Sequence, residues 1–93
     1  MIRSNQELYK AINEIRRLLK EKGGEVYEQK LYNALCVSSV VTEIFVTLKS
    51  VLNEIKKTAY FQDEKIGPLV QECKDVILQA LVNAGGWREA PDE

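Results

Sequence analysis

The side chains in this chain that could do chemistry are two cysteines and a set of carboxylates, because the sequence contains no histidine. Without histidine there is no Ser-His-Asp triad, no Cys-His pair and no histidine metal ligand. The two-metal sites of helical bundles need an inward-facing Glu-x-x-His motif, and a structural zinc site takes four ligands. We therefore predict no catalytic residue, no metal and no cofactor.

The two cysteines, Cys36 and Cys73, are expected to be inert. Cys73 falls within the apolar row of the last predicted helix, where cysteine behaves as a small buried hydrophobe. Cys36 ends the second predicted helix, away from any cluster of positive charge that would activate its thiol. The sequence leaves open whether the two sulfur atoms lie close enough to pair.

Carboxylates are then the only acid–base groups, and four of them lie within predicted helices: Glu14, Glu43, Glu54 and Glu72. All four fall outside the apolar rows, so we expect a solvated face with basic partners, such as Glu54 with Lys57. Catalysis by two carboxylates would need a cleft that so short a chain can hardly build. The prediction is that the protein is not an enzyme, with a carboxylate-based enzyme as the weakest alternative.

Four segments must position these groups, because each carries apolar residues at steps of three and four. Such spacing puts the apolar side chains on one face of a helix, and that face must be buried against other helices. The longest row is expected to be buried along its whole length and consists of Val41, Ile44, Phe45, Leu48, Val51, Leu52 and Ile55.

Capping residues set the predicted helix ends. Ser4 with Glu7 forms a capping box that begins the first helix, and Gly23-Gly24 ends it after about Lys22. Ser38-Ser39 offers an N-cap for the third helix, and Pro68 suits the first turn of the last one. The other expected segments are a second helix at 25–36, a third that fades near Ala59, a long connection at 60–67, and a last helix closed by Gly85-Gly86.

Short connections between four such helices predict an all-α, antiparallel up-and-down four-helix bundle. Residues 1–86 would form one domain, and residues 87–93 a polar tail that frays. The competing architecture is a pair of helical hairpins, in which dimerisation completes or extends the bundle.

Net charge and the length of the apolar runs indicate which classes of partner are not expected. The net charge is −1, and the apolar runs are too short to span a membrane, so neither nucleic acid nor membrane is expected. Glu25 and Glu28 would also repel phosphates at the start of the second helix. The N-terminus turns polar at once, which predicts a cytoplasmic protein.

Charge is unevenly distributed along the chain. Six basic and three acidic residues precede Gly23, whereas three basic and seven acidic residues follow Ala59. We interpret this as a first and a last helix that are neighbours with complementary fields. The alternative is a dipolar molecule that pairs antiparallel with a copy of itself.

A few apolar residues are left outside the predicted core. Leu78 and Val82 lie four residues apart on the polar side of the last helix, and Val46 and Tyr32 are similar outliers on the third and second helices. We hypothesise that these four residues contribute to a subunit or partner interface. Tyr60, Phe61 and Trp87 are secondary interface candidates, and the competing interpretation is that they cap the ends of the core.

In size, helix count and mild acidity the chain is similar to small bacterial helical proteins such as bacteriocin immunity proteins and short regulatory adaptors. That likeness concerns overall shape and transfers no residue. It favours a non-catalytic protein–protein interaction module, immunity-, antitoxin- or adaptor-like, that binds a protein partner, a second copy of itself, or both. A bundle that opens around an apolar small molecule is the alternative.

Overall fold

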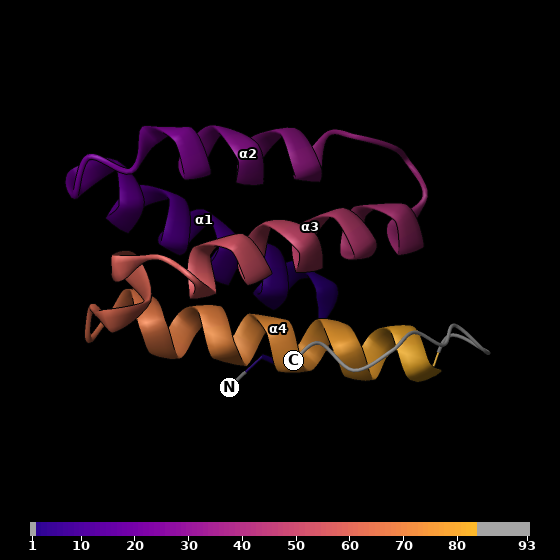
Figure 1. Ribbon diagram of the computed structural model, residues 1–93. Helices are drawn as coiled ribbons and strands as arrows, with labels where there is room; N and C mark the ends of the chain where they lie inside the picture. Colours follow the sequence, from indigo (N-terminus) through magenta and orange to yellow (C-terminus); the bar gives the residue numbers. More distant parts are fainter. Residues whose placement is uncertain (1, 84–93) are drawn as a thin grey trace.

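A computed structural model describes residues 2–83 of the chain (Figure 1). In that range the elements are α1 (Asn5–Glu21), α2 (Glu25–Leu35), α3 (Val41–Lys56), the short 3₁₀ helix η1 (Ala59–Gln62) and α4 (Ile66–Asn83). Consecutive α-helices run in opposite directions, and each packs on its neighbours in the order α1, α2, α3, α4 and back to α1 (Figure 1). This confirms the all-α four-helix bundle. The predicted tail at 87–93 and the Gly85-Gly86 stop lie outside the described residues.

The core lies on the shared axis of the four helices. Its largest side chains with almost no exposed surface come from all four, and they are Leu8, Ile12, Ile15, Leu19, Leu31, Leu48, Leu52, Ile55, Ile66, Val70, Ile77 and Leu81. The longest predicted row is buried at six of its seven positions. The exception is Val41, which is 43% exposed, so the expectation that the whole row is buried was wrong at its first residue.

The start of α1 follows its capping residues. The Ser4 hydroxyl accepts a hydrogen bond from the Glu7 amide at 3.1 Å, as the capping box predicts. The Glu7 carboxylate reaches back one residue further than expected and accepts from the Arg3 amide at 2.6 Å. At the other end of α1, Gly23 has a φ of +82°, which confirms the predicted glycine stop.

The start of α3 corrects the sequence-based prediction. The N-cap is Val40, which has no side-chain cap, rather than Ser38 or Ser39. The Ser38 hydroxyl instead accepts from the Val40 amide at 2.9 Å, so it shapes the connection and leaves the helix end uncapped. Residues 36–40 therefore form a tight corner between α2 and α3.

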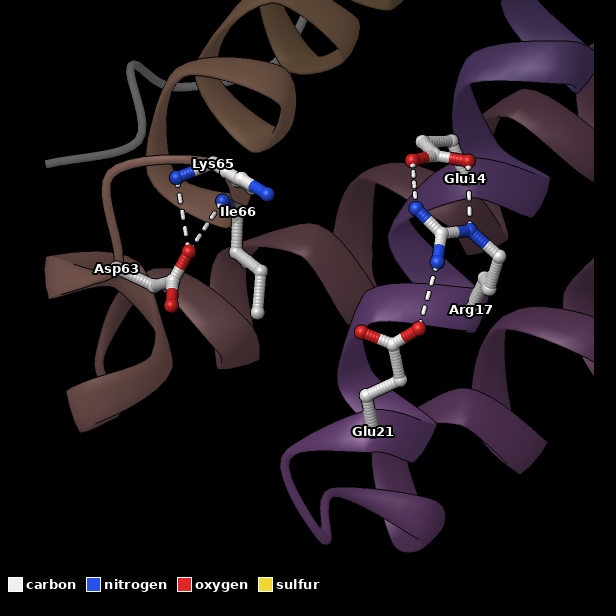
Figure 2. Close-up of polar contacts among 6 residues, drawn as sticks. All are labelled: Glu14, Arg17, Glu21, Asp63, Lys65 and Ile66. Atoms are coloured by element: carbon white, nitrogen blue, oxygen red, sulfur yellow. Dashed lines mark hydrogen bonds and ion pairs between the residues drawn. The ribbon is translucent and has the colours of Figure 1, made fainter.

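The predicted long connection at 60–67 is shorter in the structure, because η1 occupies its first part and α4 begins at Ile66, before Pro68. Asp63 begins α4: its carboxylate accepts from the Lys65 and Ile66 amides at 2.8 and 3.1 Å (Figure 2). At Gly67 the backbone lies so close to the Phe61 carbonyl oxygen that any Cβ would collide with it. The connection is thus fixed by backbone contacts.

The first and last helices are neighbours, as the uneven charge predicts. Lys22, just after α1, forms an ion pair with Asp63 at 3.1 Å. Tyr60 of η1 packs edge-on against Tyr27 of α2, with ring centroids 6.1 Å apart. A Cβ added at Gly24 would lie 3.1 Å from Cζ of Tyr60, so the backbone at Gly24 is close to this ring. These contacts close this end of the bundle over the core.

Candidate interaction surface

Among residues 2–83, the largest group of exposed apolar side chains lies at the opposite end of the bundle. Val37 is 54% exposed, Val40 51% and Val41 43%, and all three lie within five residues at the α2–α3 connection. We call these three residues the valine corner. Val82, in the last turn of α4, is 61% exposed and lies at the same end of the bundle (Figure 1).

The valine corner is exposed because α2 is short. With 11 residues against 16 to 18 in the other helices, α2 ends about two turns earlier than α4. The chain then crosses to α3 in five residues, and nothing in the described chain covers the first turn of α3. Val41 therefore points along the core row of α3 and still contacts water.

The valine corner is uncharged and held by hydrogen bonds. The segment from Cys36 to Val41 contains no charged residue. The Val37 amide donates to the Ala34 carbonyl at 3.4 Å, and the Val40 carbonyl accepts from the Ile44 amide at 3.2 Å. An apolar surface whose backbone is already ordered loses little entropy when it is buried by a partner.

Three of the four interface candidates from the sequence share one side of the bundle. Glu54 marks the side of α3 that faces α2, because it pairs with Lys30, and Glu72 marks the side of α4 that faces α1, because it accepts from the Ile2 amide. At 100° per residue, Val46 falls on the half of α3 turned towards α4, and Leu78 and Val82 fall on the half of α4 turned towards α3. Val46 and Leu78 are both half-buried.

Two lysines share this side, and sequence reasoning missed both. Lys49 of α3 and Lys74 of α4 are each only 4% exposed. Phe45 of α3 lines one shallow depression with Val76 and Ala80 of α4 and with residues 2–5, and α3 and α4 pack against each other. At 100° per residue, Lys49 and Val46 lie on the half of α3 turned towards α4, and Lys74 and Leu78 lie on the half of α4 turned towards α3. We call these four residues the α3–α4 flank.

Tyr32 lies elsewhere. It is 45% exposed on the α1 side of α2, where the Arg16 guanidinium stacks 4.9 Å from its ring centroid. Arg16 also donates two hydrogen bonds to Glu28, at 2.9 and 2.7 Å. Tyr32 is thus part of a polar α1–α2 contact and is not grouped with Leu78 and Val82.

Two of the secondary interface candidates also lie away from Leu78 and Val82. Tyr60 and Phe61 are half-buried and pack against the core at the end closed by η1. This arrangement is the one expected of residues that cap the core. Trp87 lies outside the described residues.

Several carboxylates are held in ion pairs. Arg17 bridges Glu14 and Glu21, at 2.5 and 2.6 Å (Figure 2), and its hydrogen bond lowers the pKa of Glu14. Glu54 pairs with Lys30 of α2 at 2.7 Å, so the predicted partner Lys57 was wrong. Backbone amides of Lys65 and Ile66, with Lys22, lower the pKa of Asp63 to about 2.

The cysteines differ in their surroundings. Cys73 is buried in the core, and burial raises the pKa of its thiol to about 12. Cys36 is exposed next to the valine corner, and both thiols are free.

Among residues 2–83, no cluster of three or more potential metal ligands is found. No helix in the same range has the length and apolar character needed to cross a membrane.

In comparisons with known proteins, the chain matches no family model, no curated protein and no solved structure at a significant level. The geometry of the bundle itself must therefore carry any functional proposal. One signal for the valine corner was present in the sequence, namely three valines and no charge in a helix connection. Spacing alone assigns Val41 to the apolar row of α3 and therefore predicts that it is buried.

Proposed function

We propose that the protein is a non-catalytic protein-binding module whose valine corner binds a second copy of the same chain. The observation that carries the proposal is the exposure of Val37, Val40 and Val41 at one end of an otherwise closed core. Apolar side chains gathered on a surface lower their free energy when a partner covers them.

A second copy is the partner that the charge distribution favours. A two-fold interface brings a patch against itself, so charges in the patch would meet their like. The valine corner has none between Cys36 and Val41, and three basic groups of α1 and its end form ion pairs within the chain: Arg16–Glu28, Arg17–Glu14 and Lys22–Asp63. We place this module in the cytoplasm, where free thiols such as Cys36 stay reduced.

The test is solution mass as a function of concentration, by light scattering or sedimentation. We expect a dimer whose dissociation constant rises at least about tenfold in Val40→Lys, because a lysine pair would face itself across the interface. Val26→Lys is the matched control, since Val26 is 66% exposed at the start of α2, far from the corner. A wild-type monomer at high micromolar concentration would refute the homodimer.

The variant Leu78→Glu distinguishes a dimer formed through the valine corner from a dimer formed through the interface that the sequence predicts on α4. If the dimer forms through the corner, Leu78→Glu leaves the dissociation constant close to that of the wild type. A loss of the dimer in Leu78→Glu, with Val40→Lys unchanged, would move the interface to the side of the bundle formed by α3 and α4.

A further inference from the structure

The apolar row of α3 continues backwards through the valine corner into α2. Its members are three or four residues apart throughout, and they are Tyr27, Leu31, Ala34, Val37, Val41, Ile44, Leu48, Val51 and Ile55. Steps of this size keep side chains on one face of a single helix. A connection that only reverses the chain does not require the rows before and after it to stay in phase. Residues 25–56 therefore carry the apolar pattern of one continuous helix.

The connection between α2 and α3 contains no residue that is a strong helix breaker. Residues 36–40 read Cys-Val-Ser-Ser-Val, without the glycine or proline that commonly ends a helix. The start of α3 has no side-chain cap, and the Ser38 hydroxyl shapes the corner by accepting from the Val40 amide at 2.9 Å. The α1–α2 turn differs, because Gly23 ends α1 with a φ of +82°. The bend at 36–40 is thus held by local hydrogen bonds, and the same residues are able to form a helix.

Part of α3 extends beyond the end of α2. Lys30 of α2 pairs with Glu54 of α3 at 2.7 Å, and the two helices run antiparallel (Figure 1). Since α2 ends five residues after Lys30, residues 41–48 of α3 extend past it by about 12 Å. Residues 36–43 would supply a helix of the same length to cover this part, but only from a second chain, because within one chain they make the turn. Val41, at the start of α3, is one of the side chains left in contact with water.

We infer that two copies of the chain exchange helical hairpins at the valine corner. In this dimer each chain has one continuous helix over residues 25–56, so that α1 and α2 of one copy pack on α3 and α4 of the other. Each four-helix unit keeps the contacts seen within the single chain, and only the connection changes. The inference rests on the proposed function, because a second copy is the partner, and it adds the way in which that copy is bound.

The two-fold axis of such a dimer passes near Thr42, which is midway in sequence between Lys30 and Glu54. Around this axis the three valines of each copy come together, and they gain the burial that the single chain does not provide. The stretch from Leu31 to Thr42 holds no charged residue, which suits a segment that packs against apolar side chains.

Zero-length carbodiimide cross-linking distinguishes an exchanged dimer from two closed bundles that dock, because it can join Lys30 to Glu54 and Lys22 to Asp63. Both pairs connect the two exchanged halves. The wild-type chain is refolded at millimolar concentration from a mixture of isotope-labelled and unlabelled protein, and the dimer is isolated. We expect linked peptides that combine a labelled with an unlabelled chain.

Links confined to one chain in the isolated dimer would overturn the inference and leave the proposed homodimer standing. A protein that stays monomeric after this refolding would refute both. The lifetime of the dimer is a second measurement, because hairpins must separate before an exchanged dimer returns to monomers. We expect the diluted dimer to persist for hours, and complete dissociation within seconds would contradict the exchange.

Insertion of Gly-Gly between Ser38 and Ser39 tests the continuous helix. The insertion lengthens a turn in the monomer, whereas in the exchanged dimer it interrupts the long helix and puts its apolar row out of phase. We expect the association constant of the dimer to fall at least about tenfold. The same insertion between Gly23 and Gly24 is the matched control, because the α1–α2 turn is identical in both forms, and it should leave the constant unchanged. A folded 38/39 insertion variant that dimerises like the wild type would overturn the inference.

Discussion

At one end of the bundle the α1–α2 turn and η1 cover the core, whereas at the other end the α2–α3 connection leaves three valines in contact with water. The covered end uses an aromatic pair, Tyr27 with Tyr60, and the Lys22–Asp63 ion pair. The valine corner has backbone hydrogen bonds and no charged residue. The difference shows that side chains of the described residues cover the core at one end, whereas apolar side chains stay exposed at the other.

Thiol labelling should give the largest contrast between the protected interior and the valine corner. Cys36 is exposed beside the corner and should react quickly with an aromatic disulfide near neutral pH. Cys73, with a pKa of about 12, should react on the order of 1000-fold more slowly than a free thiol, because the thiolate is the reactive form. Equal labelling of both thiols in the native protein would contradict the buried position of Cys73.

The next largest contrast is expected in the unfolding free energy lost when side-chain volume is removed at each end of the bundle. Ile66→Ala deletes a side chain with no exposed surface beside η1 and should cost about 3 kcal/mol of unfolding free energy. Val41→Ala should cost less than about 0.5 kcal/mol in the monomer, because Val41 already contacts water. Urea titrations of dilute protein measure both values, and similar losses for the two variants would mean that the valine corner is part of the monomer core.

Adding a methyl group tests the close backbone packing at the covered end. Gly67→Ala forces a Cβ against the Phe61 carbonyl, so we expect a loss of about 2 kcal/mol. Gly23→Ala has open space around its Cβ and should lose only about 1 kcal/mol, from its positive φ. Thermal melts rank the two, and a Gly67→Ala variant as stable as Gly23→Ala would show that the η1–α4 junction can shift.

The smallest expected effect is the pH dependence of the stability that Asp63 contributes. The pKa of Asp63 is about 2 in the folded chain, below its usual 3.8, so its carboxylate stabilises the fold above that usual value. The contribution is lost as the pH falls from about 4 towards 2. Asp63→Asn should therefore melt below the wild type at neutral pH, with a difference that shrinks below pH 4. A constant difference across this range would assign the effect to geometry rather than charge.

The sequence was sufficient for the architecture because the architecture depends on periodicity. Steps of three and four identified four helices, Ser4 and Gly23 marked the ends of α1, and the uneven charge placed α1 beside α4. Each of these features is local or averages over many residues. Individual polar partners were predicted less well, since Glu54 pairs with Lys30 of another helix and Lys57 is not its partner.

The candidate surface was harder to predict because exposure at a bundle end depends on relative helix lengths. Val41 belongs to a core row by spacing, and only the early end of α2 leaves it uncovered. The buried lysines have a similar cause. Lys49 and Lys74 look like ordinary surface residues in the sequence, and only the folded bundle shows that both are buried.

The shortness of α2 has a consequence for how the molecule opens. Only Leu31 and Ala34 of α2 are buried, whereas α1 and α3 each bury five or more residues. Amide hydrogens of α2 should therefore exchange with solvent through a partial opening, at lower free energy than those of α3. The remaining three helices would briefly persist as an incomplete assembly, so α2 sets the first step at which heat or denaturant dismantles the protein.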